Sequence, residues 1–237
     1  MVETEYYRTS LPSYKETLTL IYPYLNTDNH LHILDFGTGE GDMAVSVKQL
    51  FPQHNVVVGD VLISEDIKEK LMRVGVQVFE QELKMEARTR LPIESDSFDA
   101  ILFLEVLEHI IDQPVHVFSE LHRILRSGGY LFLTTPNIAS LFNRMLLLFG
   151  KQPQLYVSSL RCGFSLQRGH FREWEMDELL YLLSRTFKVE KCAYPSSLGT
   201  GGLVKERKLY RALYYPYRLF CAMKPSFRST IAIICRK

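Results

Sequence analysis

Residues 33–42 read ILDFGTGEGD, and this stretch decides the fold, because a short apolar strand pattern runs directly into a turn rich in glycine. A helical pattern begins at Asp42. A loop between a first strand and a first helix places backbone N–H groups and a helix N-terminus at the edge of a sheet where α/β proteins bind ligands. The chemistry of the ligand therefore has to be read from the residues around this turn.

Along the whole chain, short apolar runs with strand character alternate with helical patterns. The expected strands are Ile33–Phe36, Val56–Gly59, Val76–Phe79, Ala100–Leu104, Tyr130–Thr134, Phe187–Cys192 and Thr230–Cys235. The expected helices are Asp42–Phe51, Ser64–Arg73, Pro114–Arg126 (stopped by Gly128–Gly129), Asn137–Gly150 and Trp174–Arg185. This alternation predicts a doubly wound α/β fold, in which helices cover both faces of a mostly parallel, seven-stranded sheet.

Size and composition favour one ordinary globular domain. The chain has 237 residues, of which 46% are hydrophobic, and we find no repeat or long linker that would divide it, so we expect a single domain over residues 1–237. No apolar run reaches the roughly 18 residues that a membrane span needs. The polar start is unlike a signal peptide. The cysteines Cys162, Cys192, Cys221 and Cys235 form no CxxC pair, and we interpret them as free thiols, which predicts a cytoplasmic location.

Charge is unevenly distributed along the chain. Residues 137–172 contain five bases and no acid, and residues 203–237 contain nine bases and a single acid, although the net charge is only +1. Clustered Arg and Lys favour an anionic small-molecule acceptor, such as a phosphorylated, nucleotide-linked or carboxylated compound. Two alternatives stay open: peripheral contact of the second segment with an anionic membrane, bringing a lipid-linked acceptor, or a simply solvated basic face.

The glycine turn itself argues against the common phosphate-binding loops. Its spacing, Gly37-x-Gly39-x-Gly41, differs from the dinucleotide fingerprint, and no Lys-Ser/Thr follows as in a Walker A loop. Asp35, Glu40 and Asp42 surround the turn, and three carboxylates would repel a pyrophosphate. The loop suits a ligand with positive charge and no phosphate, a requirement that S-adenosylmethionine meets with its ammonium and sulfonium groups.

Five motifs in order then resemble the class I S-adenosylmethionine-dependent methyltransferases. The sequence ILDFGTGEG is similar to their first motif, and FEQEL, LPIESDSFDAILFLEVLEHI, LHRILRSGGYLFLTTPN and GHFREWEMDELLYLL are similar to later motifs of the small-molecule branch, which includes ubiquinone-biosynthesis, sugar and polyketide methyltransferases. The resemblance implies a Rossmann-like fold with an inserted substrate lid, which we place in residues 137–172 and 198–229.

The resemblance also implies which residues hold the cofactor. Gly37, Thr38 and Gly39 would cradle the methionine part, while Asp35 either orients this loop or acts indirectly on the ammonium. Asp60, with Val61 after it, lies where both ribose hydroxyls can be bound. Glu82 and Leu83 would contact the adenine, although the family more often has Asp at position 82. Leu104 and Glu105 would line the approach to the sulfonium.

Two histidines are the candidate general bases. Methyl transfer mainly requires alignment, and only a hydroxyl acceptor needs help in losing its proton, for which imidazole has a suitable pKa. We name His109 first and His170, in the segment expected to cover the substrate, second. Glu105, Glu108 and His109 at i, i+3 and i+4 could hold a divalent cation, as the ubiquinone-pathway resemblance suggests. A position of Glu105 near the ammonium and a loop-bracing role for His109 are the favoured explanation, and we assign no metal.

The sequence therefore predicts an enzyme that transfers a methyl group from S-adenosylmethionine to a small molecule, most simply at a hydroxyl oxygen. We expect no DNA partner. Three alternatives stay open: a nicotinamide-dependent oxidoreductase, which the loop spacing and acidity disfavour; an RNA or protein methyltransferase using the basic segments; and a non-catalytic cofactor-binding protein. The sequence EVLE stands where amino-group methyltransferases often carry an Asn/Asp-Pro-Pro-aromatic motif.

Overall fold

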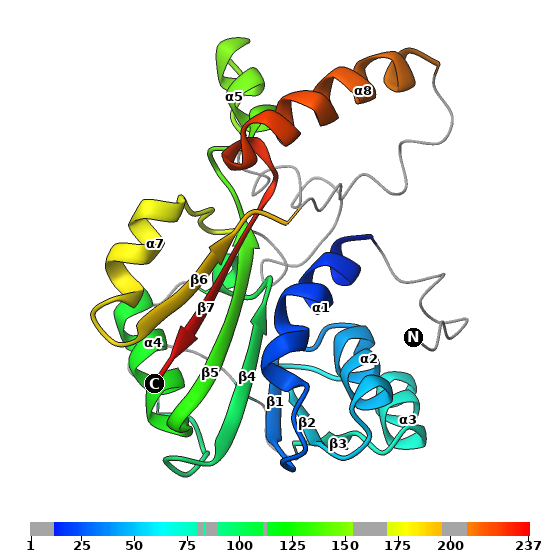
Figure 1. Cartoon of the computed structure of the whole chain (residues 1–237), viewed down its shortest axis with the longest axis vertical. Helices are drawn as coiled ribbons and strands as arrows, with labels where there is room; N and C mark the ends of the chain where they lie inside the picture. Colours follow the sequence, from blue (N-terminus) through cyan, green and yellow to red (C-terminus); the bar gives the residue numbers. More distant parts are fainter. Residues whose placement is uncertain (1–11, 80–82, 84–89, 111–112, 154–169, 196–207) are drawn as a thin grey trace.

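The chain folds around one seven-stranded sheet. The computed structural model describes residues 12–79, 83, 90–110, 113–153, 170–195 and 208–237 (Figure 1). The strands are β1 His32–Phe36, β2 Asn55–Gly59, β3 Gln77–Val78, β4 Phe98–Leu104, β5 Leu125–Pro136, β6 Lys188–Ala193 and β7 Thr230–Arg236. Their order in the sheet is β3-β2-β1-β4-β5-β7-β6.

Five neighbouring strands are parallel, and the last two reverse. The strands β3, β2, β1, β4 and β5 run parallel, with Leu34 beside Val57 on one side and Ile101 on the other. β7 pairs antiparallel with both β5 and β6. The carboxyl ends of the parallel strands therefore share one edge. The strand order switches at β1, with β2 on one side and β4 on the other, and this switch point is where this class of fold binds ligands. The predicted fold class is confirmed.

Helices pack on both faces of the sheet. α1 Pro12–Leu25, α2 Asp42–Leu50 and α3 Glu65–Arg73 lie on one face, whereas α4 Pro114–Ile124 and α7 Met176–Leu183 lie on the other (Figure 1). β1 alternates accordingly: buried Ile33 joins the α1–α3 side of the core, and Leu34 and Phe36 join the α4–α7 side. Two buried faces explain why the central strands are almost continuously apolar.

Several boundaries differ from the expectation. The helix expected to reach Arg126 ends at Ile124, and Gly128 and Gly129 lie inside β5 rather than stopping the helix. The expected helix over 137–150 is α5 Leu141–Leu148, which begins after Ser140, whose hydroxyl accepts a hydrogen bond from the Asn143 N–H. Because the Ser140 side chain caps the first turn, the helix begins at Leu141 and not at Asn137.

Two helices were not predicted. α1 contains Pro23, and α8 Lys208–Met223 contains Pro216. An internal proline removes a helical hydrogen bond, so both stretches depart from the usual sequence pattern of a helix. α8 is followed by the short 3₁₀ turn η4 Pro225–Phe227, and both lie within the expected lid segment 198–229. Part of that segment, and residues 154–169 of the other, lie outside the described residues. Within the described part, no helix has the length and apolarity needed to cross a membrane.

Candidate active site

Three glycines shape the loop after β1. Gly37, Gly39 and Gly41 have φ values of 76°, 54° and 77°, the left-handed region that disfavours other residues. A Cβ on Gly37 would lie 2.4 Å from Cγ2 of Val106, so the loop backbone packs directly against the turn after β4. The Gly37 N–H donates to the Gly59 carbonyl oxygen at 2.7 Å. The predicted glycine loop is therefore a tight left-handed turn fixed at the carboxyl edge of the sheet.

Asp35 is buried beneath this loop. The Thr38 hydroxyl donates to Asp35 Oδ2 at 2.7 Å. Burial raises the pKa of Asp35 to about 6, the Thr38 hydrogen bond lowers it in part, and the negative charge of Asp60 raises it. Asp35 thus orients the loop from below, and a cation arriving above it would favour the ionised carboxylate.

Asp60 lies at the end of β2 beside the same loop. Its Oδ2 accepts from the Gly39 N–H at 3.1 Å, and its Oδ1 accepts from the Val61 N–H at 2.6 Å. The Leu83 N–H donates to the Asp60 carbonyl oxygen at 3.1 Å, which brings Leu83 to the neighbouring position. Thus Asp60, Val61 and Leu83 adjoin the loop as expected, whereas Glu82 lies outside the described residues.

One of the three loop carboxylates is already paired. Lys70 of α3 donates to Asp42 Oδ1 and also to the Glu40 carbonyl oxygen. This cation offsets part of the negative charge that the sequence placed at the turn, and nothing in the local sequence signals it, because Lys70 lies 28 residues from Asp42. Asp35 and Asp60 remain the carboxylates closest to the floor of the loop.

Glu105 follows β4 in a strained conformation. Its φ is 56°, which is unfavourable for a residue with a side chain, while its N–H donates to the Thr134 carbonyl oxygen at 2.9 Å. The side chain keeps contact with solvent, yet nearby protein atoms desolvate its carboxyl and raise its pKa, against a hydrogen bond from Thr134 that lowers it. Strain of this kind at a strand end is typical of functional sites. Leu104 and Glu105 thus end β4 next to the glycine loop of β1.

The structure brings the two candidate histidines together. His109 ends the 3₁₀ turn η2 Leu107–His109, and the Phe171 N–H donates to the Glu108 carbonyl oxygen at 2.8 Å, which holds the 170–172 segment against this turn. The His109 and His170 rings meet edge to face, with centroids 5.0 Å apart. Both rings are partly buried. Separate in the sequence, the two histidines form one cluster beside Glu105.

Sequence analysis missed two residues that fix this cluster. Glu173 Oε1 lies 3.3 Å from His170 Nδ1, and the Asn143 side-chain amide donates to Glu173 Oε2 at 3.2 Å. The same amide nitrogen donates to the Asn137 carbonyl oxygen. Glu173 and Asn143 are both buried. A Glu three residues after a His was the available signal for Glu173, but Asn143 comes from α5 and no local pattern connects it to His170.

Glu108 is buried below His109. Only 1% of its side chain is exposed, its Oε2 accepts from the Thr135 hydroxyl at 3.0 Å, and its Oε1 lies 4.0 Å from His109 Nε2. Burial raises the pKa of Glu108 well above its ordinary value, and the charge of Glu105 raises it further. Among the described residues, ligand atoms of Glu108, His109 and His170 lie within 4.8 Å of one another, a set that fits a divalent cation and replaces Glu105 of the predicted trio by His170.

The basic residues of the first segment are partly engaged elsewhere. The Arg172 guanidinium pairs with Glu178 and stacks on Trp174, with its carbon 4.2 Å from the ring centroid. Arg144 donates to the Ala139 carbonyl oxygen. Arg161 and Arg168 lie outside the described residues. Arg172 is therefore not a ready anion ligand next to the histidines.

This arrangement fits S-adenosylmethionine. Carboxylates stand at the carboxyl ends of β1, β2 and β4, where an ammonium, two ribose hydroxyls and a sulfonium need acceptors or negative charge. Gly37 packs so closely against Val106, and Gly59 against Leu83, that neither glycine position has room for a Cβ. The residues that would hold the cofactor are Asp35, Gly37, Thr38, Gly39, Asp60, Val61, Leu83, Leu104 and Glu105.

Comparison of the sequence with known proteins finds methyltransferases. A family described as "Methyltransferase domain" matches residues 7–186. The ubiquinone biosynthesis O-methyltransferase of Candida albicans is 35% identical over 114 residues, which are 46% of this chain and 34% of that protein. The ubiquinone/menaquinone biosynthesis C-methyltransferase of Desulfotalea psychrophila is 27% identical over 99 residues, 41% of this chain and 38% of that protein. The chain thus spans less than half the length of these curated relatives.

A solved structure extends the likeness across the fold. Phosphoethanolamine N-methyltransferase 2 of Haemonchus contortus, solved in complex with S-adenosyl-L-methionine, superposes with a TM-score of 0.58 at 15% identity, covering 94% of this chain and 52% of that one. At this identity the likeness concerns the fold alone. Because the family match covers residues 7–186, which is most of the chain, the chain belongs to the methyltransferase-domain family.

Proposed function

We propose that this enzyme transfers the methyl group of S-adenosylmethionine to a hydroxyl oxygen of a small-molecule acceptor. The paired histidines beside Glu105 carry the proposal, because an imidazole near the end of β4 could remove the proton of a hydroxyl acceptor bound there. The relatives named as ubiquinone-biosynthesis O-methyltransferases support oxygen as the methylated atom, although a relative named as a C-methyltransferase also matches.

The cofactor would supply a methyl group on a positively charged sulfur, which already activates the carbon for in-line displacement. The work of the chain is to align the acceptor and remove its proton. Because Glu173 lies 3.3 Å from His170 Nδ1, it fixes the orientation of that ring and leaves Nε2 for the acceptor hydroxyl. His170 is therefore the first candidate base in this geometry, and His109 packs against it as the second.

Acidic groups around the histidines bear on the acceptor. Glu105, Glu108 and Glu173 lie within or next to the cluster, so the reacting end of the acceptor is best neutral. An anionic, sugar- or lipid-linked part would instead extend toward the basic segments of α5 and α8. The acidic groups at the histidines and the basic segments beyond them together favour an acceptor with a neutral hydroxyl at one end and a charged or lipophilic group at the other.

The test measures formation of S-adenosylhomocysteine with a panel of hydroxylated small molecules, including phenols, sugars and polyprenyl-linked phenols. His170→Ala and His109→Ala should lower turnover about 100-fold or more while the affinity for S-adenosylhomocysteine, measured by calorimetric titration, stays unchanged. His122→Ala, on α4, is the matched control. Turnover equal to that of the parent in both histidine variants would refute the proposed base.

A parallel arm separates proton transfer from cation binding at Glu108, His109 and His170. Turnover is measured after exhaustive treatment with EDTA and after addition of Mg²⁺, Mn²⁺ or Zn²⁺. Unchanged turnover supports the imidazoles as bases, whereas loss that a cation restores would assign these side chains to the cation instead.

A further inference from the structure

α5 and the residues after it carry an unusual number of exposed apolar side chains. The exposed fractions are 60% for Phe142, 43% for Met145, 58% for Leu147, 74% for Leu148 and 69% for Phe149. Single exposed apolar residues are common, but five within eight positions of one short helix and its end form a continuous feature. This helix projects beyond the edge of the sheet (Figure 1).

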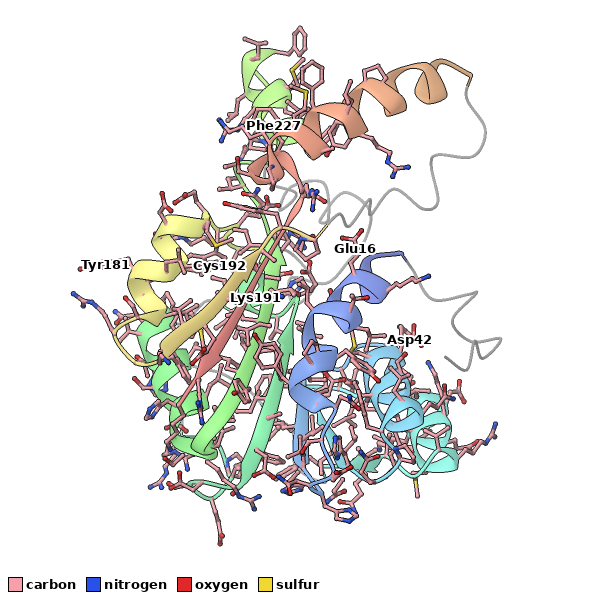
Figure 2. The ribbon with its side chains drawn as sticks, in the orientation of Figure 1. Glu16, Asp42, Tyr181, Lys191, Cys192 and Phe227 are labelled. Atoms are coloured by element: carbon pink, nitrogen blue, oxygen red, sulfur yellow. The ribbon has the colours of Figure 1, made fainter. Side chains whose placement is uncertain are left out.

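α8 adds a second group at the same end of the molecule. Leu219, Phe220 and Met223 are 63%, 53% and 74% exposed. The Asn137 side chain before α5 donates to the carbonyl oxygens of Ser226 and Arg228, and the Arg144 guanidinium lies 5.6 Å from the ring centroid of Phe227. Figure 2 labels Phe227 where the two helices meet. We call the eight exposed apolar residues of α5, Phe149 and α8 the apolar tip.

The two segments that carry the apolar tip contain basic residues and no acidic ones. Residues 137–153 and 208–228 contain no Asp or Glu, and their bases are Arg144, Lys151, Lys208, Arg211, Arg218, Lys224 and Arg228. Exposed apolar side chains on two segments whose charged residues are all basic match the chemistry of an anionic lipid surface, in which the side chains enter the headgroup region and the cations face lipid phosphates.

A second copy of the chain is a poorer occupant. A symmetric dimer through this surface would bring Arg144, Lys151, Arg218 and Lys224 of each copy close together, with no acid from 137–153 or 208–228 to offset them. Spanning the membrane is not required, since no described helix could do so. The charge pattern therefore favours a peripheral contact.

We propose that the apolar tip docks this enzyme on the surface of anionic membranes. The carboxyl end of β5 points toward the apolar tip, and α5 follows β5 in the chain (Figure 1). The docked enzyme would therefore turn the carboxyl edge of the sheet, with its histidine cluster, toward the lipid. An acceptor dissolved in the bilayer would then reach the site from the membrane side. Only this last step rests on the proposed function.

The experiment is flotation of the full chain with phosphatidylcholine vesicles that contain or lack phosphatidylglycerol. The chain should float with the anionic vesicles at low salt, stay behind with phosphatidylcholine alone, and be released by high salt. The variant Leu148→Ser/Phe149→Ser should partition at least about tenfold less. Lys224→Ser should partition about fivefold less, since that is the contribution of one cation near an anionic surface.

The matched control is Met72→Ser/Val115→Ser, which removes two exposed apolar residues from α3 and α4, and it should float like the parent. Absence of flotation at low salt, or equal flotation of the Leu148/Phe149 variant, would overturn the proposal. A dimer detected by light scattering that this variant disperses would assign the tip to a second copy. Titration with S-adenosylhomocysteine on the same samples separates a failed docking surface from a failed cofactor site.

Discussion

At the scale of single residues, the buried carboxyl of Asp35 links stability to pH. Its pKa rises from 3.8 to about 6 because burial disfavours the charge. The unfolded chain ionises first, so this group lowers the free energy of unfolding as pH rises from 3.8 through about 6, by about 3 kcal/mol in total. Below that window the group costs nothing, and above it the cost is constant.

We therefore expect Asp35→Asn to gain stability relative to the parent as pH rises from about 4 to about 8. Urea unfolding at intervals across this range measures the difference, and Asp66→Asn on the exposed face of α3 is the control. A weaker hydrogen bond between Thr38 and the new Asn side chain would lower the free energy of unfolding of Asp35→Asn by the same amount at every pH. Parallel curves for parent and Asp35→Asn would contradict the raised pKa.

Gly37 and Gly39 offer a matched comparison within one loop. Both have positive φ, but a Cβ at 39 meets nothing within 4 Å, whereas one at 37 meets Val106. Gly39→Ala should therefore cost about 1–2 kcal/mol of backbone strain alone. Gly37→Ala should cost about 2 kcal/mol more from overlap. Denaturant unfolding of both variants tests this order, and equal losses would show that the loop shifts freely away from β4.

At the scale of elements, the close approach of β2 to the chain after β3 is a packing constraint. A Cβ on Gly59 would lie 2.2 Å from Cδ1 of Leu83, which is fully buried. Gly59→Ala should destabilise the protein by about 2 kcal/mol and weaken binding of S-adenosylhomocysteine, because Leu83 must leave the expected adenine position.

A double-mutant cycle isolates this contact. Leu83→Ala makes room for the new methyl group, so the loss in Gly59→Ala/Leu83→Ala should be smaller than the sum of the single losses by about 1–2 kcal/mol. The pair Gly59→Ala/Leu71→Ala is the control and should be additive, because Leu71 lies beside Gly41 and not Gly59. Additivity of the Leu83 pair would mean that the two sites do not touch.

Sequence patterns located the elements that are regular and missed those set by distant contacts. All seven strands were predicted, and for the central parallel strands β1, β2 and β4 the signal is an almost continuous apolar run that comes from burial on both faces. α1 and α8 were not predicted, and each contains an internal proline, a residue that disfavours a helix interior. In the site, His109 and His170 were named from motifs, yet their contact depends on the hydrogen bond from the Phe171 N–H to the Glu108 carbonyl oxygen. Likewise, Asn143 of α5 donates a hydrogen bond to Glu173. Spacing along the chain carries no information on such contacts.

At the scale of the whole molecule, Asn137 joins segments that are distant in the sequence. It is 2% exposed at the end of β5. Its side-chain amide donates to the Ser226 and Arg228 carbonyl oxygens at 3.0 and 2.8 Å, and its side-chain oxygen accepts from the Ala139 N–H at 3.0 Å. Its backbone also bridges to Trp174. One residue thus connects the sheet to the start of α5, the turn after α8 and the segment that carries His170.

Asn137→Ala should therefore act over a wide area. Three hydrogen bonds at about 1 kcal/mol each predict a loss of roughly 3 kcal/mol in the free energy of unfolding. Hydrogen exchange should accelerate in peptides covering 138–153, 170–175 and 220–229 but not in those of β1 or β2. Asn29→Ala, in the exposed loop before β1, should change neither stability nor exchange. Acceleration confined to 138–140 would show that Asn137 caps only its own turn, and that α5 and α8 are held to the sheet by other contacts.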